Sequence, residues 1–453
     1  MEYIIISIVV LIISIFLFNK CAGSLSPYKP NMVSFIFFFY VICETYLSSI
    51  LIVTGFDNHY VIRNVDETSK LIGWLTIQYL MVSFPFGILL ARYLLSPNAS
   101  SYKMLIRYER SAVSSVSLFG AASKYALVLL TMISIYAAIY VFYYIGYIPV
   151  LKILEISPDD VLYVRIDSSR QFDGSIYLRN LVGIKLMPIC AYAWIAHYLR
   201  KRSFFNGLMS LVSFAFAVNV LLFDISKQPI LLFIIGILFL LYYSGVRIKT
   251  GYLILFVMMT FVILFVMYSV YGVDDFMQLS GGPVGRILFG QSAGLYYMYN
   301  IFPDIHNYIG WSSISRLISD FLGIEYMDRA ARIAMKHFNP MGIEQGKAGV
   351  MNTIFLGEAW ANFGWVGVLF SPLYVGFFVG MLYVAFLKMP KHPFIIAVFA
   401  HLSVSIPITG GFNDFIYPMW LIVCVIYIII LYILSGIIAA PFYRRLSSQT
   451  VQG

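Results

Sequence analysis

Residues 252–272 read YLILFVMMTFVILFVMYSVYG, a run without a single charged residue. A helix needs about 20 consecutive apolar residues to cross the hydrocarbon core of a membrane, or about 17 at the short end. Runs of the same kind cover residues 3–18, 33–54, 71–95, 121–145, 181–199, 207–223, 230–246, 366–387, 393–410 and 416–438. The sequence therefore predicts an all-α fold, a polytopic transmembrane bundle of about 11 helices.

The composition of the whole chain agrees with this interpretation. Of its 453 residues, 61% are hydrophobic and 11% are charged, whereas soluble domains carry about 25% charged residues. So many apolar residues cannot all hide inside one water-soluble core. We find no internal repeat and no low-complexity linker, so residues 1–453 are predicted to form a single integral-membrane domain.

The basic residues predict the orientation of the chain. Alternate loops contain Lys20, Lys29, Arg92, Lys103, Arg107, Arg110, Lys124, Arg200, Lys201, Arg202, Arg247, Lys249, Lys388, Lys391, Arg444 and Arg445. These loops hold one acidic residue, Glu109, while the other set of loops holds nearly all the acids. Because cytoplasmic loops are enriched in Lys and Arg, we expect the N-terminus outside and the C-terminus in the cytoplasm. The net charge of +9 then needs no nucleic-acid partner.

Two long segments are then extracytoplasmic: residues 146–180 and a large loop at residues 273–350, which we expect to be partly helical. In the large loop, Ile314, Leu317, Ile318, Phe321 and Leu322 recur at the spacing of an amphipathic helix. The loops on the other side are too short to hold a catalytic domain. Any chemistry is therefore expected on the outer face.

Arginines in these outer segments are candidates for binding phosphate. Arg165, Arg170 and Arg179 lie in the first segment, and Arg286 follows two glycines near the start of the second. The planar guanidinium donates two parallel hydrogen bonds and stays charged at any working pH. The alternatives are pairing with nearby aspartates for the first three and a helix-capping turn for Arg286. Lys227, in a short outer turn, either pairs with Asp224 or faces a cavity.

A second group of cations lies further along the large loop. Arg329, Arg332 and Lys336 are three and four residues apart, so they would share one face of a helix. That face is either a solvated surface or a cationic wall for a lipid-linked phosphate.

Residues 351–367 combine a charge, amides and aromatic rings at the start of an apolar run. Glu358 is a functional candidate, because a carboxylate there is expensive unless it is paired, for instance with Arg286 or Lys347. Asn352, Trp360 and Asn362 fit the lining of a sugar site, since rings stack on sugars and amides bond hydroxyls. Anchoring in the interfacial aromatic belt is the alternative for the Trp residues.

The stretch GEAWANFGWVG at residues 357–367 resembles the segment after the large outer loop of bacterial O-antigen, or oligosaccharide repeat unit, polymerases of the Wzy type. The order of parts over residues 150–390 is also similar, although the near-motif match covers only about a dozen residues. The family often has an arginine near the turn that here holds Lys227. The resemblance implies a GT-C-like glycosyltransferase of the bacterial inner membrane. The outer side, where the basic residues predict the N-terminus, would then be the periplasm. Membrane lipids and a chain-length regulator protein are further partners that it suggests.

This resemblance implies an undecaprenyl-diphosphate-linked glycan as donor and a lipid-linked repeat unit as acceptor. The reaction needs cations for the departing diphosphate and a base for the acceptor hydroxyl. We expect Arg165, Arg170, Arg179 and Arg286 to bind the diphosphates. His337 and Glu358 are alternative catalytic bases, with His306 a weaker third choice. No cofactor is expected, and no cluster of acids or His has metal-like spacing.

Two other functions remain open at this point. A lipid-linked oligosaccharide flippase or other transporter would show repeated halves and charges spread through its spans. The predicted spans are nearly uncharged apart from Glu44 and Lys185. An O-antigen ligase would use the same donor with a different acceptor, and the sequence does not separate it from a polymerase.

Overall fold

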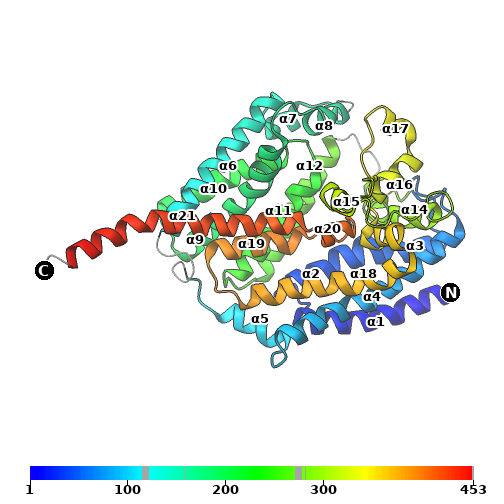
Figure 1. Ribbon diagram of the computed structural model, residues 1–453, viewed down its shortest axis with the longest axis horizontal. Coiled ribbons are helices and arrows are strands. Elements are labelled where there is room, and N and C mark those ends of the chain that lie inside the picture. Colours follow the sequence, from blue (N-terminus) through cyan, green and yellow to red (C-terminus); the bar gives the residue numbers. More distant parts are fainter. Residues whose placement is uncertain (115–121, 159, 271–277, 281, 451–453) are drawn as a thin grey trace.

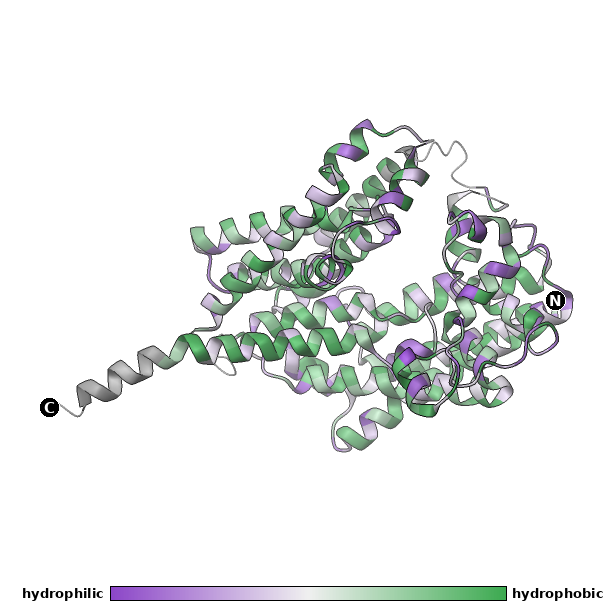
Figure 2. Cartoon of the chain, turned by 45° about the horizontal axis from the view of Figure 1, so that its top comes forward, coloured by the Kyte–Doolittle hydropathy of each residue, from purple (hydrophilic) through white to green (hydrophobic). Residues whose placement is uncertain are grey.

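The computed structural model describes residues 1–114, 122–158, 160–270, 278–280 and 282–450. Within these residues the chain consists of helices joined by loops and contains no β-strand. Long helices run side by side through the middle of the molecule, and short helices gather toward one end (Figure 1). Figure 2 shows hydrophobic residues along the long helices and hydrophilic residues concentrated in the loops and short helices. The predicted all-α class is confirmed.

Eight helical segments in the described part of the chain are long and apolar enough to cross a membrane. They are Glu2–Ala22 (α1), Met32–Val53 (α2, η1 and α3), Glu67–Leu95 (α4), Ser123–Glu155 (α6 and α7), Leu178–Arg200 (η2 and α9), Phe204–Leu221 (α10), Ile354–Lys388 (α18) and Asn413–Ala440 (α20 and most of α21, Met419–Thr450). The chain is therefore a polytopic membrane protein.

Three further apolar stretches are shorter. They are Lys227–Tyr243 (α11), Thr250–Val266 within α12 (Thr250–Val270) and Pro393–Ser405 (α19). Every predicted span thus coincides with an apolar helix, while the number of about 11 crossings stays a prediction. Ala121, Tyr271 and Gly272, at the ends of two predicted spans, lie outside the described residues, as do 273–277 and Gly281 of the predicted large loop.

Helices α4 and α18 pack closely at the centre of the bundle because glycines let their backbones meet. A Cβ atom at Gly87 would lie 2.3 Å from the carbonyl oxygen of Leu373, and one at Gly376 would lie 2.1 Å from that of Phe84. Small residues at such crossings favour tight helix pairs where water cannot drive association. Helix α14 (Ala293–Ile301) packs on both members of this pair.

Helix α18 is broken at Gly364, where φ is 58° and ψ is −141°. Residues that carry a side chain rarely adopt a positive φ of this kind, whereas glycine adopts it readily. The break separates a short helical segment at residues 354–363, which carries Glu358, from the long apolar segment that follows. The predicted span at residues 366–387 corresponds to the second segment.

The loops rich in Lys and Arg gather at one end of the bundle, which we call the basic end. Glu109 connects several of them: Lys29 Nζ lies 3.8 Å from its carboxylate, Tyr242 donates to the carboxylate at 3.3 Å, and Lys391 donates to its carbonyl at 3.2 Å. Segments far apart in the sequence therefore meet there. The two chain termini lie at opposite ends of the bundle (Figure 1).

The other end carries the predicted large loop, which is helical as expected. Its helices are α13 (Pro283–Phe289), α14 (Ala293–Ile301), α15 (Arg316–Leu322), α16 (Ala330–Phe338) and α17 (Pro340–Glu344). Helix α15 falls within the predicted amphipathic stretch, and its Leu317 and Phe321 side chains are exposed. An apolar face of this kind is suited to contact with the membrane surface.

Candidate functional site

Three cations that are far apart in the sequence line one cavity of about 300 Å³, which we call the cationic cavity. Arg165 comes from α8 (Val161–Ser169), Lys227 begins α11, and Arg286 lies in α13. Ser226, Gln228, Pro229 and Tyr268 complete the lining. Of the described residues, no Asp or Glu contributes to it. The structure thus brings together Arg165 and Arg286, two of the four arginines expected to bind diphosphate, with Lys227.

Polar contacts hold two walls of the cationic cavity. Arg165 donates to Ser226 Oγ at 3.5 Å, and the Lys227 ammonium lies 3.1 Å from the centre of the Tyr268 ring. The Asp224 carboxylate accepts from the backbone N–H and the hydroxyl of Ser226, at 3.1 and 2.7 Å. Asp224 therefore fixes the turn, and Lys227 faces the cavity.

His59 lies behind Arg286 and was not expected from the sequence. Its side chain is buried, and its ring centre lies 5.3 Å from that of Phe289. Burial and the positive charge of Arg286 lower the pKa of His59. The imidazole is therefore kept neutral beside the cavity and adds no fourth charge to it. A lone His in a polar turn carries no sequence pattern that would have identified it.

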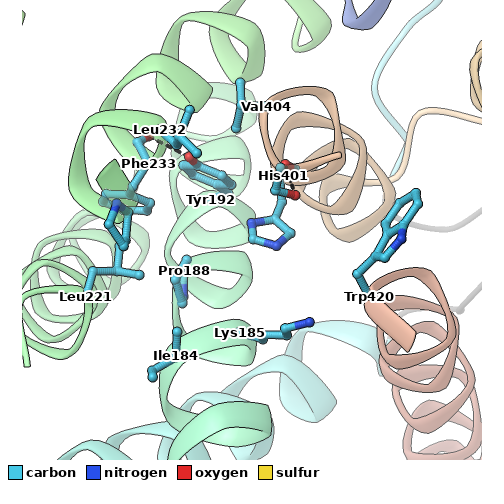
Figure 3. A pocket seen from close by; sticks show the side chains of 12 residues that line it. Ile184, Lys185, Pro188, Tyr192, Leu221, Leu232, Phe233, His401, Val404 and Trp420 are labelled. Carbon is cyan, nitrogen blue, oxygen red and sulfur yellow. Dashed lines mark hydrogen bonds between the residues drawn. The ribbon is translucent and has the colours of Figure 1, made fainter. Parts of the chain in front are cut away.

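A second cavity, which we call the bundle cavity, adjoins the first. It measures about 210 Å³, lies between η2 (Leu178–Leu186), α9 (Met187–Arg200), α10, α11, α19 and α21, and shares Pro229 with the cationic cavity. Its walls are mainly apolar. Figure 3 shows Lys185 and His401 reaching into the space between α9, α19 and Trp420. Ionisable residues inside a membrane bundle usually mark functional sites.

Glu358 forms an ion-pair cluster with Arg329 and Asp414, whose side chains are 34% and 31% exposed. Arg329 Nε and one terminal nitrogen donate to the two carboxylate oxygens of Glu358, each at 2.9 Å. The other terminal nitrogen of Arg329 donates to Asp414 at 2.9 Å, and the backbone N–H of Asn413 donates to Glu358 at 2.8 Å. Glu358 is fully buried, and any side chain at Gly411 would collide with it.

The cluster corrects the expected partner of Glu358, which is Arg329 and not Arg286 or Lys347. Burial disfavours the charge on Arg329, but the hydrogen bonds and charges of Glu358 and Asp414 outweigh this, so the pKa of Arg329 is raised. Three hydrogen bonds take up most of the lone-pair positions of the Glu358 carboxylate, and they come from the protein itself. The cluster joins the large loop to α18 and to the segment before α21.

The other cations of α16 do not form a shared wall with Arg329. Arg332 donates to the Gly349 carbonyl at 3.1 Å, and Lys336 pairs with Asp328 at 2.6 Å. Arg332 and Lys336 thus bind partners within the large loop, whereas Arg329 binds Glu358 and Asp414 outside it.

The residues expected to line a sugar site are engaged inside the protein. Asn362 donates to Asn413 at 2.8 Å, Trp360 Nε1 donates to the Phe302 carbonyl at 3.1 Å, and Asn352 donates to Gln291. Asn362 and Trp360 are buried. Their polar groups support the packing around Glu358, and their role in binding sugar stays a prediction.

Arg170 and Arg179 lie outside the cationic cavity. Arg170 donates to the Gly346 carbonyl and links the two outer segments. Arg179 is buried, donates to the carbonyls of Ser168 and Ser169 at 3.0 and 3.1 Å, and stacks on the Phe172 ring at 4.6 Å. The Arg179 contacts hold the end of α8, and with it the wall that carries Arg165.

His337 is exposed in α16 and lines a third cavity of about 540 Å³, together with His306, Glu325 and Lys336. Packed rings lead from this His337 cavity toward Arg286. The Tyr297 ring lies 6.2 Å from His337 and 5.8 Å from Phe338, and the Tyr60 ring beside His59 lies 6.4 Å from Phe338. The His337 and cationic cavities thus both lie at the end of the bundle that carries the large loop, which we call the loop end.

Within the described part of the chain, no three His, Cys, Asp or Glu side chains gather in a way that could hold a metal ion. Comparison of the chain with protein-family models, curated proteins and solved structures yields no match.

Proposed function

We propose that this protein polymerises lipid-linked oligosaccharide repeat units into O-antigen or a related surface polysaccharide at the periplasmic face of the bacterial inner membrane. It would act as a membrane glycosyltransferase of the GT-C kind. The donor would be a glycan on undecaprenyl diphosphate, and the acceptor a repeat unit on the same lipid.

The observation that carries this proposal is the cationic cavity with the bundle cavity beside it. Arg165, Lys227 and Arg286 supply positive charge for a diphosphate. The mainly apolar bundle cavity begins at the shared Pro229 and offers a place for hydrocarbon. A ligand with a doubly phosphorylated head and an isoprenoid chain would place its head in the cationic cavity and the first units of its chain toward the bundle cavity.

The chemistry follows from the charges in the cationic cavity. The acceptor hydroxyl oxygen attacks the anomeric carbon of the donor, and the bond from that carbon to the diphosphate oxygen breaks. The diphosphate leaves with the electron pair, and Arg165, Lys227 and Arg286 stabilise its added negative charge. The hydroxyl proton passes to a base.

His337 is the base that we propose, although its cavity and the cationic cavity share no described lining residue. Its ring is exposed at a cavity of the loop end, where an acceptor can reach it. Glu358 is buried, with both oxygens bonded to Arg329, and is therefore assigned a positioning role. Neutral imidazole is a common general base near neutral pH.

The proposed orientation places the loop end in the periplasm and the basic end in the cytoplasm. Cysteines introduced at Ser100, beside α5 (Ser101–Arg110), and at Ser312, in the large loop, should react with membrane-impermeant reagents from opposite sides. Both residues reacting from the same side would contradict this topology.

The activity is tested with purified protein in lipid bilayers and lipid-linked repeat units. We expect a ladder of products extended by whole repeat units, formed without a nucleotide sugar. Transfer only to lipid A core would indicate a ligase, and movement of the unextended lipid between leaflets would indicate a flippase. Either result in the absence of a ladder would overturn the proposal.

A further inference from the structure

A large cavity lies at the basic end, far from the proposed chemistry. It measures about 710 Å³ and is bounded by α5 and by the turn between α18 and α19. Four basic residues line it: Lys103, Arg107, Lys388 and Lys391. We call it the α5 cavity. Of the described residues, no Asp or Glu is part of its lining.

Two polar side chains of the α5 cavity are buried. Lys391 is 2% exposed and donates to the Glu109 carbonyl at 3.2 Å, while its ammonium lies 4.6 Å from the centre of the Tyr108 ring. Tyr108 is 3% exposed, and its hydroxyl has no hydrogen-bond partner among the described residues. The hydroxyl oxygen is enclosed by protein atoms, so Tyr108 forms the packed wall under Lys391.

The positive-inside rule does not by itself account for this arrangement. Orientation requires basic residues in the loops but not their convergence on one cavity, nor the burial of Lys391. The nearest carboxylate, Glu109, is directed elsewhere, because it accepts from Tyr242 at 3.3 Å and lies 3.8 Å from Lys29. Four cations around one space repel each other, and an anion between them would offset this repulsion.

We propose that the α5 cavity binds an anion with two phosphate groups. Arg107 and Lys103 would contact one phosphate and Lys388 and Lys391 the other. The same chemistry is offered by the headgroup of cardiolipin and by free pyrophosphate. Basic pockets at the cytoplasmic ends of membrane helices bind such lipid headgroups. This site is independent of the polymerase proposal.

The test measures binding to the intact protein in nanodiscs. One arm titrates cardiolipin into phosphatidylcholine nanodiscs and counts bound lipid by native mass spectrometry. The other arm adds inorganic pyrophosphate to cardiolipin-free nanodiscs and uses calorimetry. Binding in the first arm alone identifies a lipid ligand, and binding in the second alone a soluble one. Binding in neither arm would overturn the proposal.

Variants separate a built site from general surface charge. Arg107→Gln and Lys391→Met should each weaken binding about fivefold, the effect of one basic residue near an anionic lipid surface. Arg110→Gln is the matched control, because Arg110 belongs to the same helix and is exposed but does not line the cavity. Arg107 is itself exposed, so Arg107→Gln keeps the test decisive even if Lys391→Met fails to fold. Equal weakening by Arg107→Gln and Arg110→Gln would contradict the proposal.

The dependence on pH gives a second measurement. Burial lowers the pKa of Lys391 to about 8, although the Glu109 carboxylate acts in the opposite direction. The groups that face Lys391 are Tyr108 and Glu109 from α5 and Lys388 from the end of α18. As the pH rises through about 8, Lys391 loses its proton and cardiolipin should bind more weakly. The Lys391→Met variant should not show this step, and a wild-type affinity unchanged across it would contradict the proposal.

Discussion

Arg329 and Arg286 both belong to the large loop, yet their surroundings differ in kind. Arg329 meets two carboxylates, at Glu358 and Asp414, and uses all three guanidinium nitrogens on them. Arg286 shares a cavity with two other cations, and none of the described lining residues is acidic. Arg329 is neutralised by two carboxylates, whereas Arg286 adds its charge to a cavity whose described lining contains two further cations.

This difference indicates that Arg329 stabilises the fold and that Arg286 is available to a ligand. A buried ion pair loses stability when one partner is removed, because the other charge is left without compensation. Converging cations tend instead to destabilise the free protein and favour whatever anion enters. Substitutions in the ion-pair cluster should therefore change stability, and those in the cationic cavity should change activity.

The largest effect is expected for Glu358→Gln in the ion-pair cluster. The neutral amide no longer balances Arg329, so the free energy of unfolding should fall by about 3 kcal/mol. Thermal unfolding of the purified protein measures this, with the exposed Glu344→Gln as the matched control. A Glu358→Gln protein of normal stability that extends no glycan would restore Glu358 as the base.

His337→Gln tests the other candidate base and should leave stability unchanged. Loss of a general base typically reduces the rate by about 100-fold or more. The rate of chain extension should fall accordingly, while donor binding remains. His306→Gln is the control, because His306 lines the same cavity. Near-normal extension by His337→Gln would remove His337 from the mechanism.

Arg165→Lys and Arg286→Lys keep the charge of the cationic cavity but remove the planar fork of donors. We expect extension to fall about tenfold, less than for complete loss of a donor, with normal thermal stability. Arg170→Lys should have little effect, because Arg170 donates to the Gly346 carbonyl outside the cavity. Full activity of both Arg165→Lys and Arg286→Lys would contradict the ligand-binding role that distinguishes Arg286 from Arg329.

Lys336→Met should have the smallest effect. Lys336 pairs with Asp328 at 2.6 Å, but both side chains are about half exposed. Exposed ion pairs contribute at most about 1 kcal/mol, so the unfolding temperature should change only slightly. A loss as large as that of Glu358→Gln would show that burial does not decide the strength of these ion pairs.

The helices were predictable because hydrophobicity is a local property of the chain. The start of α18 was not: it begins at Ile354, whereas the apolar run suggested a start near residue 366. Glu358 and Asn362 make the intervening stretch look like a loop. Arg329 neutralises Glu358, and the side chain of Asn413 accepts a hydrogen bond from Asn362. Both partners lie far away in the sequence, and their contacts let the segment fold as a buried helix.

The candidate site was predictable residue by residue but not as an arrangement. Arg165, Lys227 and Arg286 stood out singly, since basic residues in outer loops do not serve orientation. Their convergence depends on how α8, α11 and α13 pack, which no local pattern contains. The partner of Glu358 was missed for the same reason, because the loop offers several cations and tertiary packing selects Arg329.

The shared wall at Pro229 affects how substrate supply would be controlled. A ligand with its head in one cavity and its chain in the next arrives by lateral diffusion within the bilayer and not from bulk water. Occupancy would then follow the mole fraction of lipid-linked glycan in the membrane, and diluting the vesicles at constant lipid composition would leave the rate per enzyme unchanged.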